Sequence, residues 1–212
     1  MGEPELPPRS QAKREAIHVA AQELFTRQGF EGTSMDAIAE AAHVSKQTLY
    51  RYYENKEALF VATLQRLALH HTAAQTLQEV QGAPIDSLAA LEQALVTWAQ
   101  LTVENIMQPT YLALLRVLIA ELPRFPYLGS LFTSAVPQEG GAIINTLLTS
   151  ATAHGVITPV DTEAAARLLA GSLLTYVFGE GLFRPDSIPQ PPAPERVAAL
   201  VRLFLRGMVH EE

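Results

Sequence analysis

Residues 33–53, TSMDAIAEAAHVSKQTLYRYY, contain two short amphipathic segments separated by only three residues, HVS. The first segment places Ile38 and Ala39 on one side, and the second places Leu49 and Tyr53 on one side because they are four positions apart. Two short helices with so short a connection pack against each other as a helix-turn-helix unit. The second helix is then expected to bury Leu49 and Tyr53 and to expose its remaining side chains.

Capping residues indicate where the helices of this region begin. Thr33 is the expected N-cap of the first short helix, and Ser45 is expected to cap the second through the backbone amide of Thr48. Asn55 is the expected N-cap of a longer, fourth helix that runs to about Gln81.

The rest of the chain also follows the helical period. A first amphipathic helix begins at Ser10, and Gly29 is expected to end it. Further helical patterns lie near 85–106, 109–122, 126–153, 162–183 and 194–209. Strand alternation and hairpin dipeptides are absent from the sequence. We therefore predict an all-α fold with a disordered leader (1–9), a three-helix helix-turn-helix domain (10–56) and a helical C-terminal domain (57–212), joined through the long fourth helix.

The net charge of −7 argues against a protein that coats nucleic acid over its whole surface, but it allows a local basic patch. Residues 44–56 contain Lys46, Arg51 and Lys56 against Glu54 alone. The absence of cysteine excludes disulfides and thiolate zinc sites. The N-terminus lacks an apolar signal segment, and LLAGSLLTYVFGEGLF is too short and too interrupted to span a membrane. We expect a soluble, cytoplasmic protein.

The exposed side of the second short helix suits DNA. Lysine and arginine pair with phosphates or guanine edges, glutamine reaches adenine edges in the major groove, and hydroxyl groups donate to phosphate oxygens. Helix N-termini nearby also favour anions. The predicted DNA-binding residues are Thr33, Ser34, Ser45, Lys46, Gln47, Thr48, Tyr50, Arg51, Tyr52 and Lys56.

The stretch AAQELFTRQGFEGTSMDAIAEAAHVSKQTLYRYYENKEALF closely resembles the DNA-binding region of TetR-family transcriptional regulators. The shared features are GF.GTS, IA..A.VS, TLY.YY and NKEALF, within residues 10–62. Further along, LLRVLIAELPRFPYLGSLF resembles the C-terminal domain of an AefR-like branch. The resemblance implies an all-helical homodimer that binds a palindromic operator, typically represses nearby genes, and leaves DNA when a small molecule binds its C-terminal domain.

The resemblance also assigns roles within the predicted DNA-binding set. It places Lys46, Gln47 and in some members Arg51 at positions that read bases. It gives mainly phosphate contacts to Thr33, Ser45, Thr48, Tyr50, Tyr52 and Lys56. The chain departs from the family at His43, where glycine is common. We expect a positive φ at His43, because histidine tolerates the left-handed region better than most residues do.

The C-terminal helices contain few charged residues, which favours a small, largely apolar effector. An ordinary core position is the alternative for each candidate pocket residue. These candidates are Trp98, Met107, Tyr111, Phe132, Tyr176 and Phe178. The last two helices are rich in small and apolar residues, and the resemblance implies that they form the homodimer interface as a four-helix bundle. A two-fold dimer also suits two half-sites in adjacent major grooves.

Two other classes of protein are alternatives to a DNA-binding regulator. An all-helical binding or adaptor protein could use the helix-turn-helix only as a structural element. A metalloenzyme could use the Glu-x-x-His spacing of residues 15–18 and 40–43, which occurs in di-iron bundles. The second of these motifs ends a short helix, and the adjacent His70 and His71 point about 100° apart. We therefore expect no metal site, no cofactor and no catalytic residue.

Overall fold

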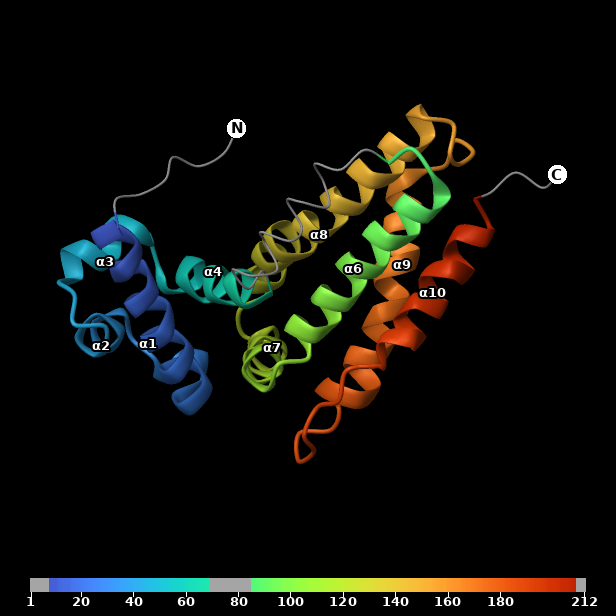
Figure 1. Cartoon of the computed structure of the whole chain (residues 1–212). Helices are drawn as coiled ribbons and strands as arrows, with labels where there is room; N and C mark the ends of the chain where they lie inside the picture. The colour runs from blue at the N-terminus through green and yellow to red at the C-terminus, as the bar shows by residue number, and fades with distance from the viewer. Residues whose placement is uncertain (1–7, 69–84, 209–212) are drawn as a thin grey trace. The chain divides into compact units, whose positions relative to one another are not determined.

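The computed structural model describes residues 8–68 and 85–208, and every regular element in these ranges is helical (Figure 1). The helices are α1 (Pro8–Gly32), α2 (Met35–Ala41), α3 (Lys46–Tyr52), α4 (Lys56–Ala68), α6 (Leu88–Ile106), α7 (Pro109–Glu121), α8 (Tyr127–Ala153), α9 (Thr162–Tyr176), the π-helical segment η1 (Val177–Leu182) and α10 (Pro194–Arg206). The predicted all-α class is confirmed. Residues 1–7 of the predicted leader and the fourth helix beyond Ala68 lie outside the described residues, whereas Pro8 and Arg9 belong to α1.

The chain divides into two compact units. The first contains the residues up to Arg66 together with Ala113–Ala135, and the second contains Leu67–Leu112 and the residues from Val136 onward. Helices α7 and α8 therefore contribute to both units. The predicted division into 10–56 and 57–212 does not include this second stretch of the first unit, because a segment so distant in sequence cannot be assigned from local patterns.

An aromatic cluster forms the centre of the first unit. The Phe25 and Phe60 rings lie 4.9 Å apart, and the Phe30 ring lies 5.3 Å from Phe60 and 5.4 Å from Phe125. Phe25, Phe30 and Phe60 are fully buried, and each such burial contributes roughly 2 kcal/mol. The cluster joins α1, α4 and the turn between α7 and α8.

Helices α6, α9 and α10 pack together in the second unit. Helix α10 buries Val197, Val201 and Leu205, which recur every four residues along one side of the helix. Arg202 on another side of α10 pairs with Glu92 of α6, with 3.4 Å between the charged atoms. The helix predicted near 194–209 is thus present as α10.

The start of α2 differs from the prediction by one residue. Ser34 caps α2, because its Oγ accepts from the Ala37 amide at 3.1 Å. Thr33 is buried, and its hydroxyl donates to the Gly29 carbonyl at 2.7 Å. Gly29 has a positive φ of 73°, and this bend in the chain brings the Gly29 carbonyl to Thr33. The N-cap predicted at Thr33 is therefore wrong.

Candidate nucleic-acid interface

The turn between α2 and α3 has the geometry of a helix-turn-helix connection. His43 has a φ of 53°, which confirms the predicted positive value. The Val44 amide donates to the Ala39 carbonyl at 3.0 Å and closes the end of α2. Ser45 caps α3 as predicted, because its Oγ accepts from the Thr48 amide at 3.1 Å.

Helix α3 has the inward and outward sides that its spacing predicts. Leu49 is fully buried, and Tyr53, directly after the helix, is 5% exposed. Tyr50 on the other side is 51% exposed. The outward surface of α3 consists of the exposed or half-exposed side chains Ser45, Lys46, Gln47, Thr48, Tyr50, Arg51 and Tyr52.

A buried chain of hydrogen bonds anchors Tyr53 to α1 and α4. Thr63 Oγ1 donates its hydrogen to a backbone carbonyl of α4 at 2.8 Å, so it accepts from His18 Nδ1 at 3.1 Å. His18 Nε2 then carries no hydrogen and accepts from the Tyr53 hydroxyl at 2.7 Å. Burial, reinforced by the charges of Arg66 and Arg14, lowers the pKa of His18 to about 4 and keeps the ring neutral.

Tyr52 lies where α3 meets the start of α1. Its hydroxyl is hydrogen-bonded to Ser10 Oγ and lies 3.4 Å from Arg51 Nη2, and the Arg51 guanidinium lies 5.2 Å from the centre of the Tyr52 ring. The hydrogen bonds with Ser10 and Arg51, with a smaller contribution from the charge of Lys13, lower the pKa of Tyr52. Positive charge therefore surrounds this end of α3.

Several predicted contact residues already have partners within the protein. Lys46 pairs with Asp36 of α2 at 2.6 Å on the exposed surface, where solvent makes such pairs weak. Lys56 Nζ donates to the carbonyls of Phe30 at 2.7 Å and Thr33 at 2.9 Å. Thr33 itself is buried. The side chains of Thr33 and Lys56, both predicted to contact DNA, thus bind carbonyl groups of the protein.

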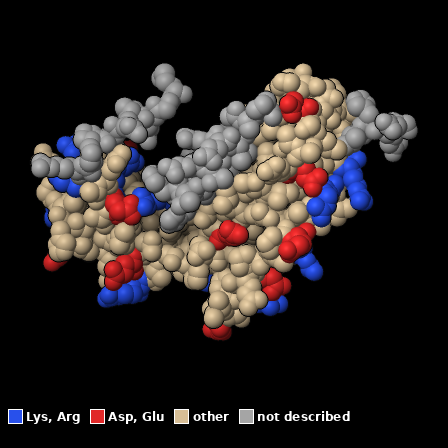
Figure 2. Space-filling view, in the orientation of Figure 1, with Lys and Arg blue, Asp and Glu red and all other residues tan. Residues whose placement is uncertain are grey.

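The charged side chains are not evenly placed. In the face drawn in Figure 2, lysine and arginine side chains lie over the end of the first unit that carries α3, and another group lies over α10. Arg51 has no carboxylate partner among the described residues, unlike Lys46. An anion that approaches the outward surface of α3 therefore meets an available guanidinium beside the Tyr52 hydroxyl.

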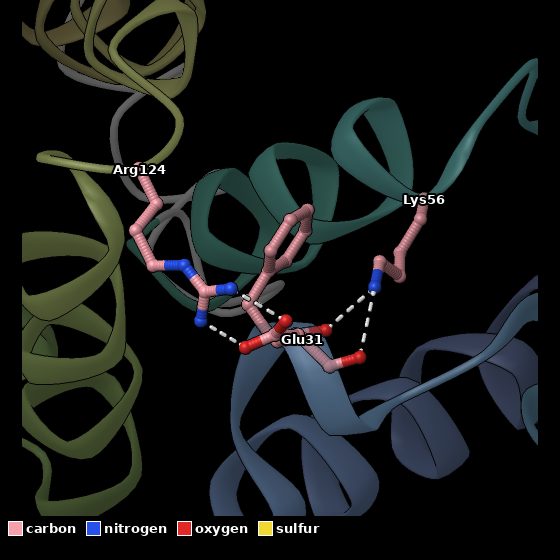
Figure 3. A network of polar contacts seen from close by, with 4 residues as sticks. Glu31, Lys56 and Arg124 are labelled. Carbon is pink, nitrogen blue, oxygen red and sulfur yellow. Dashed lines mark hydrogen bonds and ion pairs between the residues drawn. The ribbon is translucent and has the colours of Figure 1, made fainter.

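The turn between α7 and α8 supplies polar contacts that sequence reasoning missed. Arg124 binds both carboxylate oxygens of Glu31, one of them at 2.6 Å, and this bonding lowers the pKa of the Glu31 carboxyl (Figure 3). The Tyr127 hydroxyl donates to Glu57 at 2.7 Å. In the sequence this turn is only the segment LPRFPY between two expected helices, and no local pattern reveals a partner about ninety residues away.

The predicted pocket residues fall into different environments. Trp98, Met107 and Tyr111 are buried in the second unit, and burial raises the pKa of the Tyr111 phenol. Phe132 belongs to the first unit and is half-buried. Tyr176 is half-buried and Phe178 is 41% exposed. A pocket role for these residues remains a prediction.

Asn145 of α8 is a residue that the sequence did not single out. Its Oδ1 is buried and has no hydrogen-bond partner in the described part of the chain. A buried amide oxygen of this kind costs about 1–3 kcal/mol unless a donor reaches it. It is therefore a candidate acceptor for a ligand hydroxyl or amine.

The histidines do not assemble a metal site within residues 8–68 and 85–208, where no group of three or more potential ligands clusters. His18 is instead occupied by Thr63 and Tyr53. His70 and His71 lie outside the described residues. No helix in the described ranges is both long and apolar enough to cross a bilayer.

Comparison with known proteins matches both parts of the chain to family models. Residues 17–63 match the model of bacterial regulatory proteins of the tetR family. Residues 93–207, more than half of the chain, match the C-terminal domain of AefR-like transcriptional repressors. Among curated relatives, the transcriptional regulator RutR of Escherichia coli is 46% identical over 56 residues, which is 26% of each chain. The match thus spans about a quarter of such relatives' length.

Solved structures extend the similarity to nearly the whole chain. A TetR-family regulator from Mesorhizobium loti is 28% identical, with a TM-score of 0.73 over 96% of this chain and 100% of that one. The flavonoid-responsive regulator FrrA is 30% identical, with a TM-score of 0.64 over 94% of this chain and 98% of that one.

Proposed function

The chain belongs to the TetR family of transcriptional regulators, and from this we propose that it is a dimeric repressor that a small effector releases from a palindromic operator in the cytoplasm. The observation that carries the DNA-binding part is the outward surface of α3. It presents amide, hydroxyl and cationic groups on a helix whose other side is anchored by Leu49 and Tyr53.

In this proposal α3 enters the major groove. Gln47, Lys46 and Arg51 contact base edges or phosphates, and the hydroxyls of Thr48, Tyr50 and Tyr52 donate to phosphates. Ser34 and Ser45 add contacts at the starts of α2 and α3. Lys46 exchanges its exposed bond with Asp36 for a DNA contact, because a pair at the surface is worth little in water.

Exposed apolar side chains on α9 and α10 support the proposed dimer. Leu168 of α9 is 65% exposed and Leu203 of α10 is 61% exposed. Leu174 of α9 and Phe178 of η1, which follows α9 directly, are also exposed. Apolar groups of this size on adjacent helices favour burial against a second copy, and a two-fold pair places two α3 helices for two half-sites.

The effector is proposed to be largely apolar with at least one hydrogen-bond donor. In this proposal the buried Trp98, Met107 and Tyr111 would be its apolar surroundings, and Asn145 Oδ1, which is buried and has no partner in the described residues, would be its acceptor. FrrA, a relative at 30% identity, responds to flavonoids, which carry such hydroxyls. Hydroxylated aromatic compounds are therefore the first class to test.

The bonds between the α7–α8 turn and the end of α1 support a route for the effector signal. The α7–α8 turn holds Glu31 through Arg124, and Phe125 packs on Phe30. Helices α7 and α8 continue from this turn into the second unit. Movement of these helices on effector binding would displace the first unit's helices, including α4, and so change the spacing of the two α3 helices.

DNA selection tests the proposed function. The protein is incubated with a random duplex pool, and binding to enriched sequences is measured by fluorescence anisotropy with and without hydroxylated aromatics. We expect a palindromic site whose affinity falls when the effector is added. Failure to enrich any duplex would instead favour an adaptor protein with a purely structural helix-turn-helix.

A further inference from the structure

We propose that Lys56 is a positioning residue for DNA recognition, which holds the start of α2 in place, and that it does not itself neutralise a phosphate. This inference rests on the proposed DNA-binding function. It assigns to a basic residue beside the DNA-facing helices a role that its charge alone does not suggest.

In the described part of the chain, the Lys56 ammonium contacts backbone carbonyls of the protein. Nζ donates to the Phe30 carbonyl at 2.7 Å, and the Glu31 carbonyl lies 3.4 Å away (Figure 3). Nζ also donates to the Thr33 carbonyl at 2.9 Å. An ammonium has three N–H donors, so these three carbonyls account for its capacity. A phosphate could bind Nζ only by displacing one of them.

The side chain is also held by the ring beneath it. Nζ lies 4.4 Å from the centre of the Phe30 ring, on which a cation is attracted to the face. Phe30 is fully buried and packs against Phe25, Phe60 and Phe125. Lys56 is therefore bound to a rigid part of the first unit.

The carbonyls that Lys56 binds lie at the end of α1 and at the entry to α2. Phe30 and Glu31 lie in the last residues of α1, where carbonyls lack partners within the helix; the Phe30 carbonyl also accepts from the Thr33 amide at 3.4 Å. Thr33 directly precedes Ser34, which caps α2. Lys56, the first residue of α4, thus ties the end of α1 and the entry to α2 to the start of α4.

This placement matters for DNA because α2 supports α3. The two helices pack against each other, and the turn between them is closed by the bond from Val44 to Ala39. If Lys56 no longer held Thr33, the start of α2 and then α3 would shift relative to the groove. Base contacts depend on that alignment, whereas attraction to phosphates depends mainly on charge.

The two roles differ in their salt dependence. A lysine that neutralises a phosphate releases counterions, and its loss reduces the slope of log K against log salt by about 0.9. A positioning lysine leaves this slope unchanged. Its loss weakens binding to the specific sequence and leaves binding to other duplexes at the wild-type level.

The test uses Lys56→Met, which keeps the length of the side chain and removes the donors, with Arg51→Met as the control for a cation on the outward surface. The full-length proteins are titrated with a duplex selected by the wild type and with a scrambled duplex. The titrations are made at several salt concentrations and at a temperature below each protein's Tm. For Lys56→Met we expect about tenfold weaker binding to the selected duplex, equivalent to about one lost base-pair contact. Binding to the scrambled duplex and the salt slope should match the wild type, while Arg51→Met lowers the slope by about 0.9.

Two results would overturn the inference. Equal weakening on both duplexes with a reduced slope would identify Lys56 as a phosphate contact. A lowered Tm with wild-type affinity for both duplexes would show a role in stability alone. If Lys56→Met does not fold, Lys56→Gln keeps an N–H donor without the charge, and the same two results decide. If the wild type enriches no duplex, the proposed function fails first, which is a separate outcome.

Discussion

The buried His18 makes the stability of the first unit depend on pH. The imidazole is 6% exposed, its Nδ1 donates to Thr63 and its Nε2 accepts from Tyr53. Its pKa is lowered from 6.5 to about 4, first by burial and then by Arg66 and Arg14. Protonation would place a charge in this site and would turn Nε2 from an acceptor into a donor facing the Tyr53 hydroxyl.

The size of the effect follows from the two pKa values. Below pH 6.5 the unfolded chain binds a proton at His18 that the folded chain does not bind until about pH 4, so the free energy of unfolding decreases as the pH falls between these values. The whole interval corresponds to about 3 kcal/mol, at about 1.4 kcal/mol per pH unit. At pH 5 the loss is about 2 kcal/mol relative to neutral pH.

Urea denaturation of wild type and His18→Gln at pH 7.5 and pH 5, at one protein concentration, measures this effect. The variant cannot titrate at this position, so its stability should decrease by about 2 kcal/mol less than that of the wild type between the two pH values. His154→Gln, which removes an exposed histidine directly after α8, is the control for the loss of a histidine elsewhere in the chain. An identical pH dependence for His18→Gln and wild type would refute the reasoning, even if the variant is less stable at both pH values.

Three further predictions concern other parts of the chain. Ser34→Ala removes the N-cap of α2 and should lower the free energy of unfolding by about 1 kcal/mol in thermal denaturation, whereas Thr33→Ser, which keeps a hydroxyl, should cost less. Leu203→Glu should shift the protein toward monomer in analytical ultracentrifugation, and Val19→Glu, at an exposed position of α1, should not. Gly181→Ala should cost about 1 kcal/mol, because its Cβ would lie 3.0 Å from Leu112 Cδ1; a wild-type Tm would contradict this close packing.

The helices and the DNA-facing side of α3 could be predicted because their signals are local. Leu49 and Tyr53 share a side through the helical period, and Ser45 caps the helix through its own backbone neighbourhood. The positive φ at His43 is inferred from the resemblance, because glycine is common at this position in the family. The error at Thr33 also comes from relying on local signals, because Thr33 and Ser34 are equally good N-caps by residue type. In the structure Thr33 bonds the Gly29 carbonyl, and Ser34 is left to cap α2.

The contacts between distant segments could not be predicted in this way. The pairing of Glu31 with Arg124 depends on the tertiary arrangement of the first unit, and so does the approach of Phe125 to Phe30. The partners of Lys56 precede the two helices of the helix-turn-helix in the sequence, whereas Lys56 follows them. Charge alone therefore could not distinguish a phosphate contact from a bond to backbone carbonyls.

The hydrogen-bond and ion-pair partners of the basic residues decide where the helix-turn-helix unit can attract a phosphate. Counting residues 44–56 gives equal weight to Lys46, Arg51 and Lys56. In the structure Lys46 faces Asp36 and Lys56 faces carbonyls, whereas Arg51 and Lys13 have no carboxylate partner among the described residues. These two cations flank the Tyr52 hydroxyl, whose pKa they lower together with Ser10. The strongest attraction for a phosphate should therefore lie where the end of α3 meets the start of α1, and not at the turn before α3.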